Sequence, residues 1–230
     1  MTGTLWGIGV GPGDPDLLTV KAVKVLAGVA ALAYPLNADG GSQARTIAAP
    51  HLPAGLPETG LPFSFTPDAD SAPAYRAAAA RLTEALADGD VAVLCEGDPL
   101  LYGTFGNLLP YLDATVPVRV VPGIAAATAA AATVARPLAS GDGALAVLPA
   151  TLGGAALAAR LAHGDAAVIL KPGRHTPAAR RALAHAGRLA DALAVARATR
   201  AGEWWAPLTD LPEDATLPYF SLILVPEAAP

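Results

Sequence analysis

Short apolar runs alternate with segments of helical periodicity along most of the chain. Apolar runs bounded by glycine, proline or polar residues predict strands at Thr4–Val10, Val29–Tyr34, Leu61–Phe65, Val91–Cys95, Val118–Val121, Ala144–Leu148, Ala166–Leu170, Ala192–Ala198 and Tyr219–Val225. Helical spacing predicts helices at Leu17–Ala27, Gln43–Ala49, Ala74–Ala87, Ile124–Val134, Gly154–Leu161 and Pro177–His185. This alternation of strand and helix indicates the α/β class.

Local features indicate which strand is central and where the chain divides. Val91–Cys95 contains no polar side chain apart from the thiol, as expected of a strand buried on both faces. Asp16 is the expected N-cap of the first helix. The last two predicted strands have no helix between them and fit an antiparallel pair. The segment Asp113–Pro117 predicts a boundary between domains spanning residues 1–115 and 116–230.

The composition fits a folded protein without membrane spans. Of 230 residues, 53% are hydrophobic and 15% charged, which excludes a disordered chain, although alanine inflates the hydrophobic share. The longest apolar stretches, Val25–Leu36 and Ile124–Ala135, are far shorter than the roughly 18–20 residues of a spanning helix. The N-terminus lacks the basic start of a signal peptide, and the single Cys95 excludes a disulfide scaffold or a Cys-cluster zinc site. We therefore expect a cytoplasmic protein with no membrane contact.

The charge is acidic overall but uneven along the chain. The net charge is −5, and no basic run is present, which argues against nucleic acid binding. Residues 1–115 carry 5 basic and 12 acidic side chains, whereas residues 116–230 carry 10 basic and 8 acidic ones. An anionic ligand would therefore find its cations in the second half.

A glycine-rich segment, Gly9–Pro15, directly follows the first predicted strand and reads GVGPGDP. It fits no dinucleotide fingerprint, because proline or aspartate occupies the position of the third glycine in either frame. The Gly-Lys-Ser/Thr ending of a phosphate-binding loop is also absent. Two interpretations remain open: a rigid strand-to-helix turn, or a loop whose backbone approaches a ligand closely.

A polar cluster, Glu96–Thr104, follows the buried strand and reads EGDPLLYGT. The carboxyl end of a central parallel strand is where open α/β sheets bind ligands. Asp98 is either a ligand contact or the cap of a helix that begins near Pro99. Glu96 has no evident capping role, which favours a functional one.

Two further segments follow strands in the second half of the chain. In Pro122–Thr128, a Pro-Gly turn precedes small residues that would let a ligand approach, or it simply begins an alanine-rich helix. Lys171–His175 places Lys171, Arg174 and a histidine at the end of a strand, where they form either an anion site or a solvated turn. His51, His163 and His185 have no metal-ligand spacing, so we expect no metal site.

The sequence contains no nucleophile-and-base motif such as G-x-S-x-G or H-E-x-x-H. Chemistry that depends on positioning two bound reactants remains open.

Taken together and in this order, the motifs resemble those of the tetrapyrrole methylases, a family that uses S-adenosylmethionine (SAM) to methylate corrin and sirohaem precursors. Gly9–Pro15 is similar to the family's GxGPGDP motif, Gly97–Gly103 to its GDPxxYG motif and Pro122–Thr128 to its PG-I/V-[ST]-[SA] segment, although Ala125 replaces the usual hydroxyl residue. Leu5–Thr19, Gly40–Arg45, Lys171–Arg174 and Tyr219–Val225 are most similar to the precorrin-2 C20-methyltransferases within that family.

The resemblance implies a two-domain α/β fold with a mainly parallel N-terminal sheet, a mixed C-terminal sheet, an active site in the cleft between the domains, and a homodimer. SAM would be the methyl donor and a tetrapyrrole the substrate. Carried over position by position, the resemblance places SAM contacts at Pro12, Glu96, Gly97, Asp98, Leu101, Tyr102, Ala125 and Ala126, with weaker matches at Leu148, Ala198 and Phe220.

The remaining candidate residues follow from the chemistry of this reaction. Asp14 is the candidate catalytic carboxylate, which would take the proton lost from carbon or stabilise developing positive charge. Arg45, Lys171 and Arg174 are candidate binders of the substrate's carboxylates. Alternatives remain open: methylation of another tetrapyrrole position, of rRNA ribose or of a diphthine precursor, a SAM- or tetrapyrrole-binding module without turnover, and a nicotinamide-dependent oxidoreductase, which the absent fingerprint disfavours. The motifs do not distinguish a metal-free from a cobalt-containing substrate.

Overall fold

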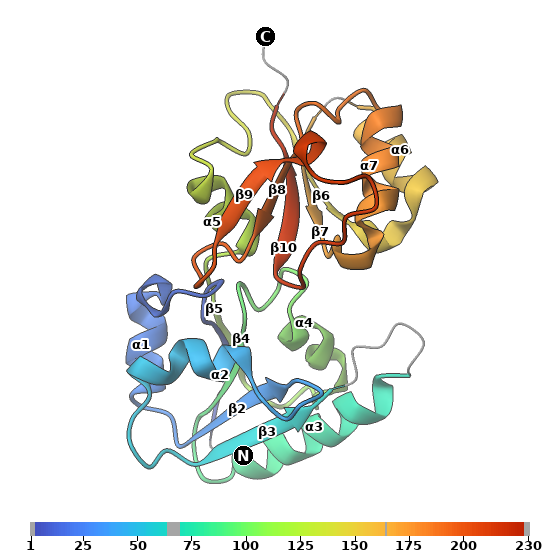
Figure 1. Ribbon diagram of the computed structural model, residues 1–230. Helices are drawn as coiled ribbons and strands as arrows, with labels where there is room; N and C mark the ends of the chain where they lie inside the picture. The colour runs from blue at the N-terminus through green and yellow to red at the C-terminus, as the bar shows by residue number, and fades with distance from the viewer. Residues whose placement is uncertain (1–2, 64–69, 164, 228–230) are drawn as a thin grey trace. The chain divides into compact units, whose positions relative to one another are not determined.

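The chain forms two units, each built around its own sheet. A computed structural model describes residues 3–63, 70–163 and 165–227 and divides between Ala125 and Ala126 (Figure 1). The division lies ten residues later than the predicted one at 115/116. The physical reason is β5 (Val118–Val121), which pairs with β1 and completes the first sheet.

The first unit holds a five-stranded sheet in the order β3-β2-β4-β1-β5, and every neighbouring pair in it is parallel. Its other strands are β1 (Leu5–Gly9), β2 (Ala31–Leu36), β3 (Glu58–Pro62) and β4 (Val91–Cys95). Its helices are α1 (Val20–Leu26), α2 (Gln43–Ala48), α3 (Ala72–Ala85) and α4 (Thr104–Leu108). The predicted strand Leu61–Phe65 reaches into residues 64–69, which lie outside the described part of the chain.

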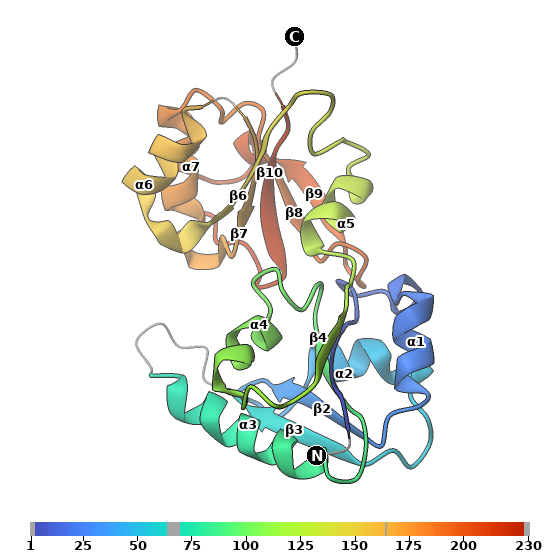
Figure 2. The ribbon, with the colours of Figure 1, turned by 180° about the vertical axis from the view of Figure 1, so that it is seen from behind.

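Strand β4 is central, and its side chains enter both cores of the first unit. Val93 and Cys95 pack against α3 and α4, whereas Ala92 and Leu94 pack against α1 and α2. Figures 1 and 2 show one pair of helices on each face of this sheet. A strand covered on both faces reads as a continuous apolar run, as predicted from the sequence of β4.

Asp90 fixes the starts of β1 and β4 beside each other. Its carboxylate accepts hydrogen bonds from the Thr4 backbone N–H (2.7 Å) and from Trp6 Nε1 (2.9 Å). These two donors, the Thr4 N–H foremost, hold the pKa of Asp90 below its usual range. The opposite, carboxyl ends of the same strands are therefore aligned with each other.

The second unit holds a mixed sheet in the order β6-β7-β10-β8-β9. Strands β6 (Leu145–Pro149) and β7 (Ala166–Leu170) are parallel, and β10 (Ser221–Val225) runs antiparallel to β7 and to β8 (Leu193–Ala196). Helix α5 (Ala126–Thr133) covers one face, and α6 (Gly154–Leu161) and α7 (Thr176–His185) cover the other. The predicted antiparallel pair of late strands is confirmed.

Three local predictions differ from the structure. The first helix begins after Thr19, whose hydroxyl accepts from the Ala22 N–H, and not after Asp16. No helix begins at Pro99; α4 starts five residues later, at Thr104. An additional edge strand, β9 (Trp204–Pro207), lies between the two late strands in sequence and pairs with β8.

Within the described residues, no helix is long and apolar enough to cross a bilayer.

Candidate functional site

Three loops meet at the carboxyl ends of β4, β1 and β5, which are neighbours in the first sheet. After the regular strand pairing ends, Val10 N–H donates to the Cys95 carbonyl (2.9 Å). The Gly97 N–H donates to the Gly11 carbonyl (2.8 Å), so that Gly11 and Gly97 form an isolated antiparallel bridge. The sequence motifs around Gly11 and Gly97 are thus hydrogen-bonded to each other through main-chain atoms.

Glycine is required where these loops touch. A Cβ atom on Gly9 would lie 2.5 Å from the Gly123 Cα, and one on Gly123 would lie 2.1 Å from the Gly97 carbonyl oxygen. Both distances are too short for any side chain, and the atoms in the way belong to the backbone. Gly97 also has φ +65°, a conformation that favours glycine. Each of the three predicted motifs therefore contributes one glycine to a single backbone-to-backbone contact.

Asp98 ties two of these loops together. One carboxylate oxygen accepts from the Leu100 N–H (2.9 Å), and the other accepts from the Gly123 N–H (3.1 Å). The first bond is a local turn, whereas the second joins residues 25 positions apart. The structure thus assigns Asp98 to the positioning of the Pro-Gly loop and not to the cap of a helix.

The side chains around this meeting point suit a cationic ligand. The segments 9–14, 96–103 and 122–125 contain Asp14, Glu96 and Asp98 and no basic residue. Glu96 is half-buried, and Leu101 and Tyr102 are exposed, at 42% and 49%. Tyr102 has φ +55°, an unfavourable conformation for a tyrosine that concentrates at functional sites. SAM carries a positive sulfonium and an aromatic base, so this combination of carboxylates, backbone and an exposed ring fits it.

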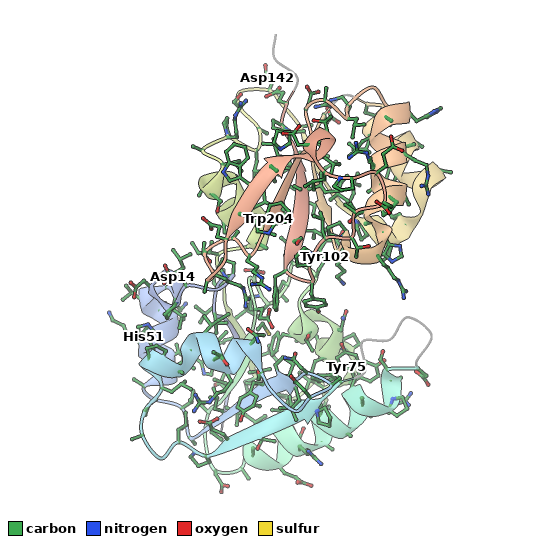
Figure 3. All side chains as sticks on the ribbon, viewed as in Figure 1. Asp14, His51, Tyr75, Tyr102, Asp142 and Trp204 are labelled. Carbon is green, nitrogen blue, oxygen red and sulfur yellow. The ribbon has the colours of Figure 1, made fainter. Side chains whose placement is uncertain are left out.

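Asp14 lies at the same edge of the first sheet as Tyr102 (Figure 3). Its carboxylate accepts from the Asp16 N–H (2.9 Å) and caps a 3-10 turn, Pro15–Leu17. Pro12, in the same loop, is buried. The capping bond occupies one oxygen of Asp14 and fixes the carboxylate at the loop, and a catalytic role for it remains a prediction.

Cys95 lies beneath the same edge, at the end of β4, and is buried. Burial raises the pKa of its thiol to about 12, so the thiol stays neutral at ordinary pH. A neutral buried thiol is a poor nucleophile, which agrees with chemistry carried out by positioning.

The second unit brings several predicted residues to one edge of its own sheet. Lys171 directly follows β7, Arg174 follows on an exposed turn, and Phe220 directly precedes β10. Because β10 is antiparallel to β7, the end of β7 and the start of β10 lie at the same edge. Ala198 is half-buried against the α5 core. Leu148 is only 4% exposed and belongs to the α6–α7 core, so any ligand contact of Leu148 would involve its backbone.

Arg45 forms an ion pair within the first unit. Its guanidinium forms a bidentate ion pair with Glu58, with Nε–Oε2 and Nη2–Oε1 distances of 3.0 and 2.9 Å. The pair holds the pKa of Glu58 below its usual value, and burial together with Glu58 raises the pKa of the adjacent Tyr34. Arg45 is therefore neutralised within the first unit. Its predicted role in binding carboxylates would require a substrate group to displace Glu58.

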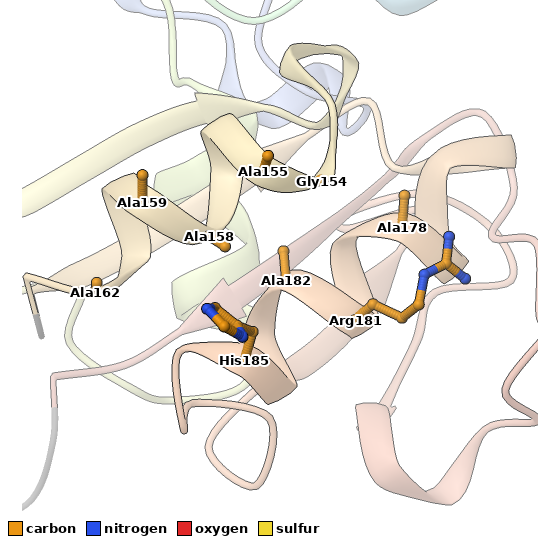
Figure 4. A pocket seen from close by; sticks show the side chains of 9 residues that line it. All are labelled: Gly154, Ala155, Ala158, Ala159, Ala162, Ala178, Arg181, Ala182 and His185. Carbon is orange, nitrogen blue, oxygen red and sulfur yellow. The ribbon is translucent and has the colours of Figure 1, made fainter.

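Ala125 is the last residue of the segment 122–125 at the first edge, and Ala126 begins α5 of the second unit as an exposed residue. A cavity of about 550 Å³ lies between α6 and α7. Most of the residues that line it are alanines, and Arg181 and His185 also line it (Figure 4). It contains none of the predicted site residues. Over residues 3–63, 70–163 and 165–227, no cluster of three or more His, Cys, Asp and Glu side chains is arranged to hold a metal ion.

Sequence reasoning missed Arg197 and Arg200. Both follow β8, at the edge that also carries Lys171. The predicted strand Ala192–Ala198 contained Arg197, and only with β8 ending at Ala196 does Arg197 directly follow a strand, as Lys171 does.

Comparisons with known proteins agree with this geometry. Residues 4–211 match the family model of the Tetrapyrrole (Corrin/Porphyrin) Methylases. The chain is 42% identical to the Precorrin-2 C(20)-methyltransferase of Sinorhizobium sp, over 97% of this chain and 95% of that one. It is 34% identical to the Cobalt-precorrin-2 C(20)-methyltransferase of Salmonella typhimurium, over 98% and 97% of the two chains.

A further relative is longer. The chain is 42% identical to the Cobalamin biosynthesis protein CobIJ of Mycobacterium tuberculosis over 97% of its own length, but it spans only 46% of that protein. It thus covers about half the length of the CobIJ relatives.

Solved structures share the fold. The cobalt precorrin-4 methyltransferase CbiF superposes with a TM-score of 0.74 at 24% identity, covering 97% of this chain and 94% of that one. The uroporphyrin-III C-methyltransferase of Thermus thermophilus, complexed with S-adenosylhomocysteine (SAH), superposes with a TM-score of 0.71 at 24% identity, covering 98% and 92%. The family model over residues 4–211 and the 42% identity with a relative over nearly the whole of both chains show that the chain belongs to the tetrapyrrole methylases.

Proposed function

We propose that this protein is a SAM-dependent methyltransferase of cobalamin biosynthesis that methylates C20 of precorrin-2 or of cobalt-precorrin-2. The observation that carries the proposal is the end-to-end match, at 42% identity, with a precorrin-2 C20-methyltransferase. The loop contact among Gly9, Gly97 and Gly123 supports it, because it joins all three motifs of the family in one place.

The protein's part in such a reaction is alignment and the exclusion of water. SAM supplies a methyl group on a sulfonium, which is already an activated leaving group. The chain therefore has to hold an electron-rich ring carbon in line with that methyl group and keep water out. The predicted SAM contacts of the first unit, from Pro12 to Tyr102, lie on loops fixed by backbone hydrogen bonds, which suits precise alignment.

Asp14 is the proposed carboxylate for the proton that leaves the ring carbon. It is held at the rigid Pro-Gly-rich loop by its bond to the Asp16 N–H. Asp14→Asn keeps an oxygen for that bond and removes the negative charge. We expect single-turnover methylation to slow by about 100-fold while SAH affinity stays unchanged. An unchanged rate would remove Asp14 from the mechanism.

The decisive experiment is incubation with precorrin-2 and methyl-labelled SAM, followed by NMR of the product. Label at C20 is the expected result, and label at another ring position would assign the chain to a different methylation step. Parallel reactions with precorrin-2 and cobalt-precorrin-2 show which form is used. SAH binding by calorimetry without any turnover would instead indicate a binding module.

We further propose that the protein acts as a cytoplasmic homodimer, as the family resemblance implies. Light scattering of the purified protein is expected to give twice the mass of 22.9 kDa. A mass equal to that of one chain would contradict the proposed dimer but would leave the proposed methylation reaction unaffected.

A further inference from the structure

Two basic residues of the second unit have the left-handed backbone conformation that glycine normally occupies. Lys171 has φ +56° at the end of β7, and Arg197 has φ +55° at the end of β8. For residues other than glycine, this conformation costs free energy and concentrates at functional sites. Because glycine would be the favoured residue at both positions, the presence of long basic side chains there indicates that these side chains have a function.

Strand register places these two residues on either side of the start of β10. Leu170 is paired with Leu222, and Ala196 is paired with Ser221. The next residues, Lys171 and Arg197, therefore lie at the same end of the sheet, where β7 and β8 end and β10 begins. Since β10 separates β7 from β8, their backbones lie two strand spacings, or about 10 Å, apart. The Arg197 N–H donates to the Phe220 carbonyl (2.6 Å), which fixes the turn after β8 to the start of β10.

Arg200 adds a third cation at this edge. Its guanidinium carbon lies 3.9 Å from the centre of the Phe220 ring, a close cation–π contact. Stacking on the ring fixes the plane of the guanidinium. Such an arrangement suits bidentate pairing with a carboxylate.

The nearby acidic group, Glu203, is directed elsewhere. Its Oε2 atom accepts from the Thr199 N–H (2.5 Å) and from the Thr133 hydroxyl (3.0 Å). Among the described residues, neither the Arg174 nor the Arg197 guanidinium has a carboxylate within 4.0 Å. The edge thus carries positive charge that the second unit does not neutralise by direct pairing with these two arginines.

We propose that Arg197 and Arg200 join Lys171 and Arg174 in a carboxylate-binding surface that positions the tetrapyrrole by its acidic side chains. This basic edge, as we call the four residues, rests on the proposed function and extends it by naming two residues that neither the motifs nor the relatives assign. Lys171 and Arg197 receive carboxylates on either side of the Phe220 backbone, and Arg200 receives one above the Phe220 ring. A ring bearing several carboxylates matches several fixed cations better than a single one.

The test uses glycine to separate the side chain from the backbone. Arg197→Gly and Lys171→Gly remove the cation at positions where glycine is the favoured residue, so the fold is expected to be as stable or more so. We expect each variant to weaken binding of uroporphyrin, a stable polycarboxylate porphyrin followed by fluorescence, by about tenfold. The KM for precorrin-2 should rise in parallel, with a smaller change in kcat, and the salt dependence of binding should become shallower. Arg197→Lys should recover part of the affinity, because it keeps the charge but not the planar fork.

Arg181→Ala is the matched control, because it removes an exposed arginine of α7 that lies outside the basic edge. It is expected to leave uroporphyrin binding unchanged. If Arg197→Gly binds uroporphyrin as the parent does, at low and high salt, the inference is overturned while methylation of precorrin-2 would still stand. If precorrin-2 is not methylated but the glycine variants still lose porphyrin affinity, the proposed function fails and the basic edge stands.

Discussion

The edge of the first sheet and the basic edge of the second are built in opposite ways. At the first, the motif segments carry three carboxylates and no basic residue, and the loops touch through glycines without side chains. At the second, segments 171–175 and 197–200 carry lysine, arginine and histidine and no carboxylate, and two long side chains occupy conformations that glycine prefers. The first edge suits a ligand that contacts closely packed backbone and a few carboxylates. The second edge suits a ligand that pairs with long cationic side chains.

This difference parallels the uneven charge of the chain. Under the proposed function, a sulfonium-bearing methyl donor suits the acidic first edge and a carboxylate-rich acceptor suits the basic second edge. Five of the eleven predicted SAM contacts are glycine, alanine or proline, and four of the eleven lie in the second unit, whereas the proposed tetrapyrrole contacts are long cationic side chains. Substitutions should therefore act through folding at the first edge and through affinity at the second.

The largest expected effect is on stability, from Gly123→Ala. The new Cβ would lie 2.1 Å from the Gly97 carbonyl oxygen, and three loops would have to separate to admit it. We expect a loss of more than about 3 kcal/mol in the free energy of unfolding, with SAH binding lost in any folded fraction, as measured by denaturant titration and calorimetry.

Gly154→Ala is the control in the second unit. A Cβ there would lie 3.9 Å from the nearest atom, the Ala178 carbonyl oxygen, at the first position of α6. This variant should be neutral or more stable because alanine favours the helix. If Gly123→Ala were equally well tolerated, the first edge would not depend on contact between backbones.

Asp98→Ala comes next. It leaves the Leu100 and Gly123 N–H groups without their acceptor and frees the Pro-Gly loop. We expect a loss of about 2–3 kcal/mol of stability together with weaker SAH binding. Asp39→Ala removes a similar turn bond, to the Gly41 N–H, from an exposed loop elsewhere in the unit, and it should have a smaller effect. Equal effects would show that the link from Asp98 to Gly123 contributes nothing.

Cys95 allows a pH test of the same edge. Burial raises the pKa of the folded thiol to about 12, whereas an unfolded cysteine ionises near pH 8.5, as is typical. The unfolded chain therefore releases this proton first, so stability should fall as pH rises between these values, by up to about 2 kcal/mol at pH 10. The contribution is constant below that range.

Denaturant titrations from pH 7 to pH 10 measure this slope, and Cys95→Ala should remove it. The native thiol should also resist iodoacetamide, whereas the unfolded chain should react. Rapid alkylation of the folded protein would show a reactive nucleophile at an edge that we describe as acting through shape.

Much of this architecture was predictable because local patterns and burial agree. The bounds of α6 and β7 were predicted correctly, and the apolar run of β4 marked the central strand. Strand β9 was missed because Trp204–Pro207 is only four residues long, ends in proline and lies at a sheet edge. The three glycine motifs were found one at a time, but their mutual contact depends on sheet order, which no local pattern specifies.

The roles of single side chains were less predictable for a related reason. The Asp-Pro pair at Asp98 reads locally as a helix start, but its second hydrogen bond reaches a residue 25 positions away. Arg45 reads as an available cation, but Glu58 reaches it only because β3 pairs beside β2. In both cases the role of the side chain depends on a partner that is distant in the sequence and that only the fold brings near.

The smallest expected effect tests whether the first unit contributes a cation of its own. Glu58→Gln removes the charge that holds Arg45 and leaves an amide at the same place. Because both side chains are partly exposed, we expect a stability change of less than about 1 kcal/mol. Arg45 lowers the pKa of the Glu58 carboxylate, so its contribution is fully present above the usual glutamate pKa of about 4.3. Any difference from the parent should shrink as the pH falls below that value and disappear once Glu58 is protonated in the folded protein as well.

The same variant also compares the two edges directly. If carboxylates of the tetrapyrrole bind only at the basic edge, freeing Arg45 should leave uroporphyrin affinity within about twofold of the parent, whereas Arg197→Gly weakens it by about tenfold. A marked gain in affinity for Glu58→Gln, lost again in the double variant with Arg45→Ala, would show that Arg45 binds the substrate once Glu58 is displaced. The separation of charge between the two units would then be incomplete, and Glu58 would act as a competitor for the same carboxylate.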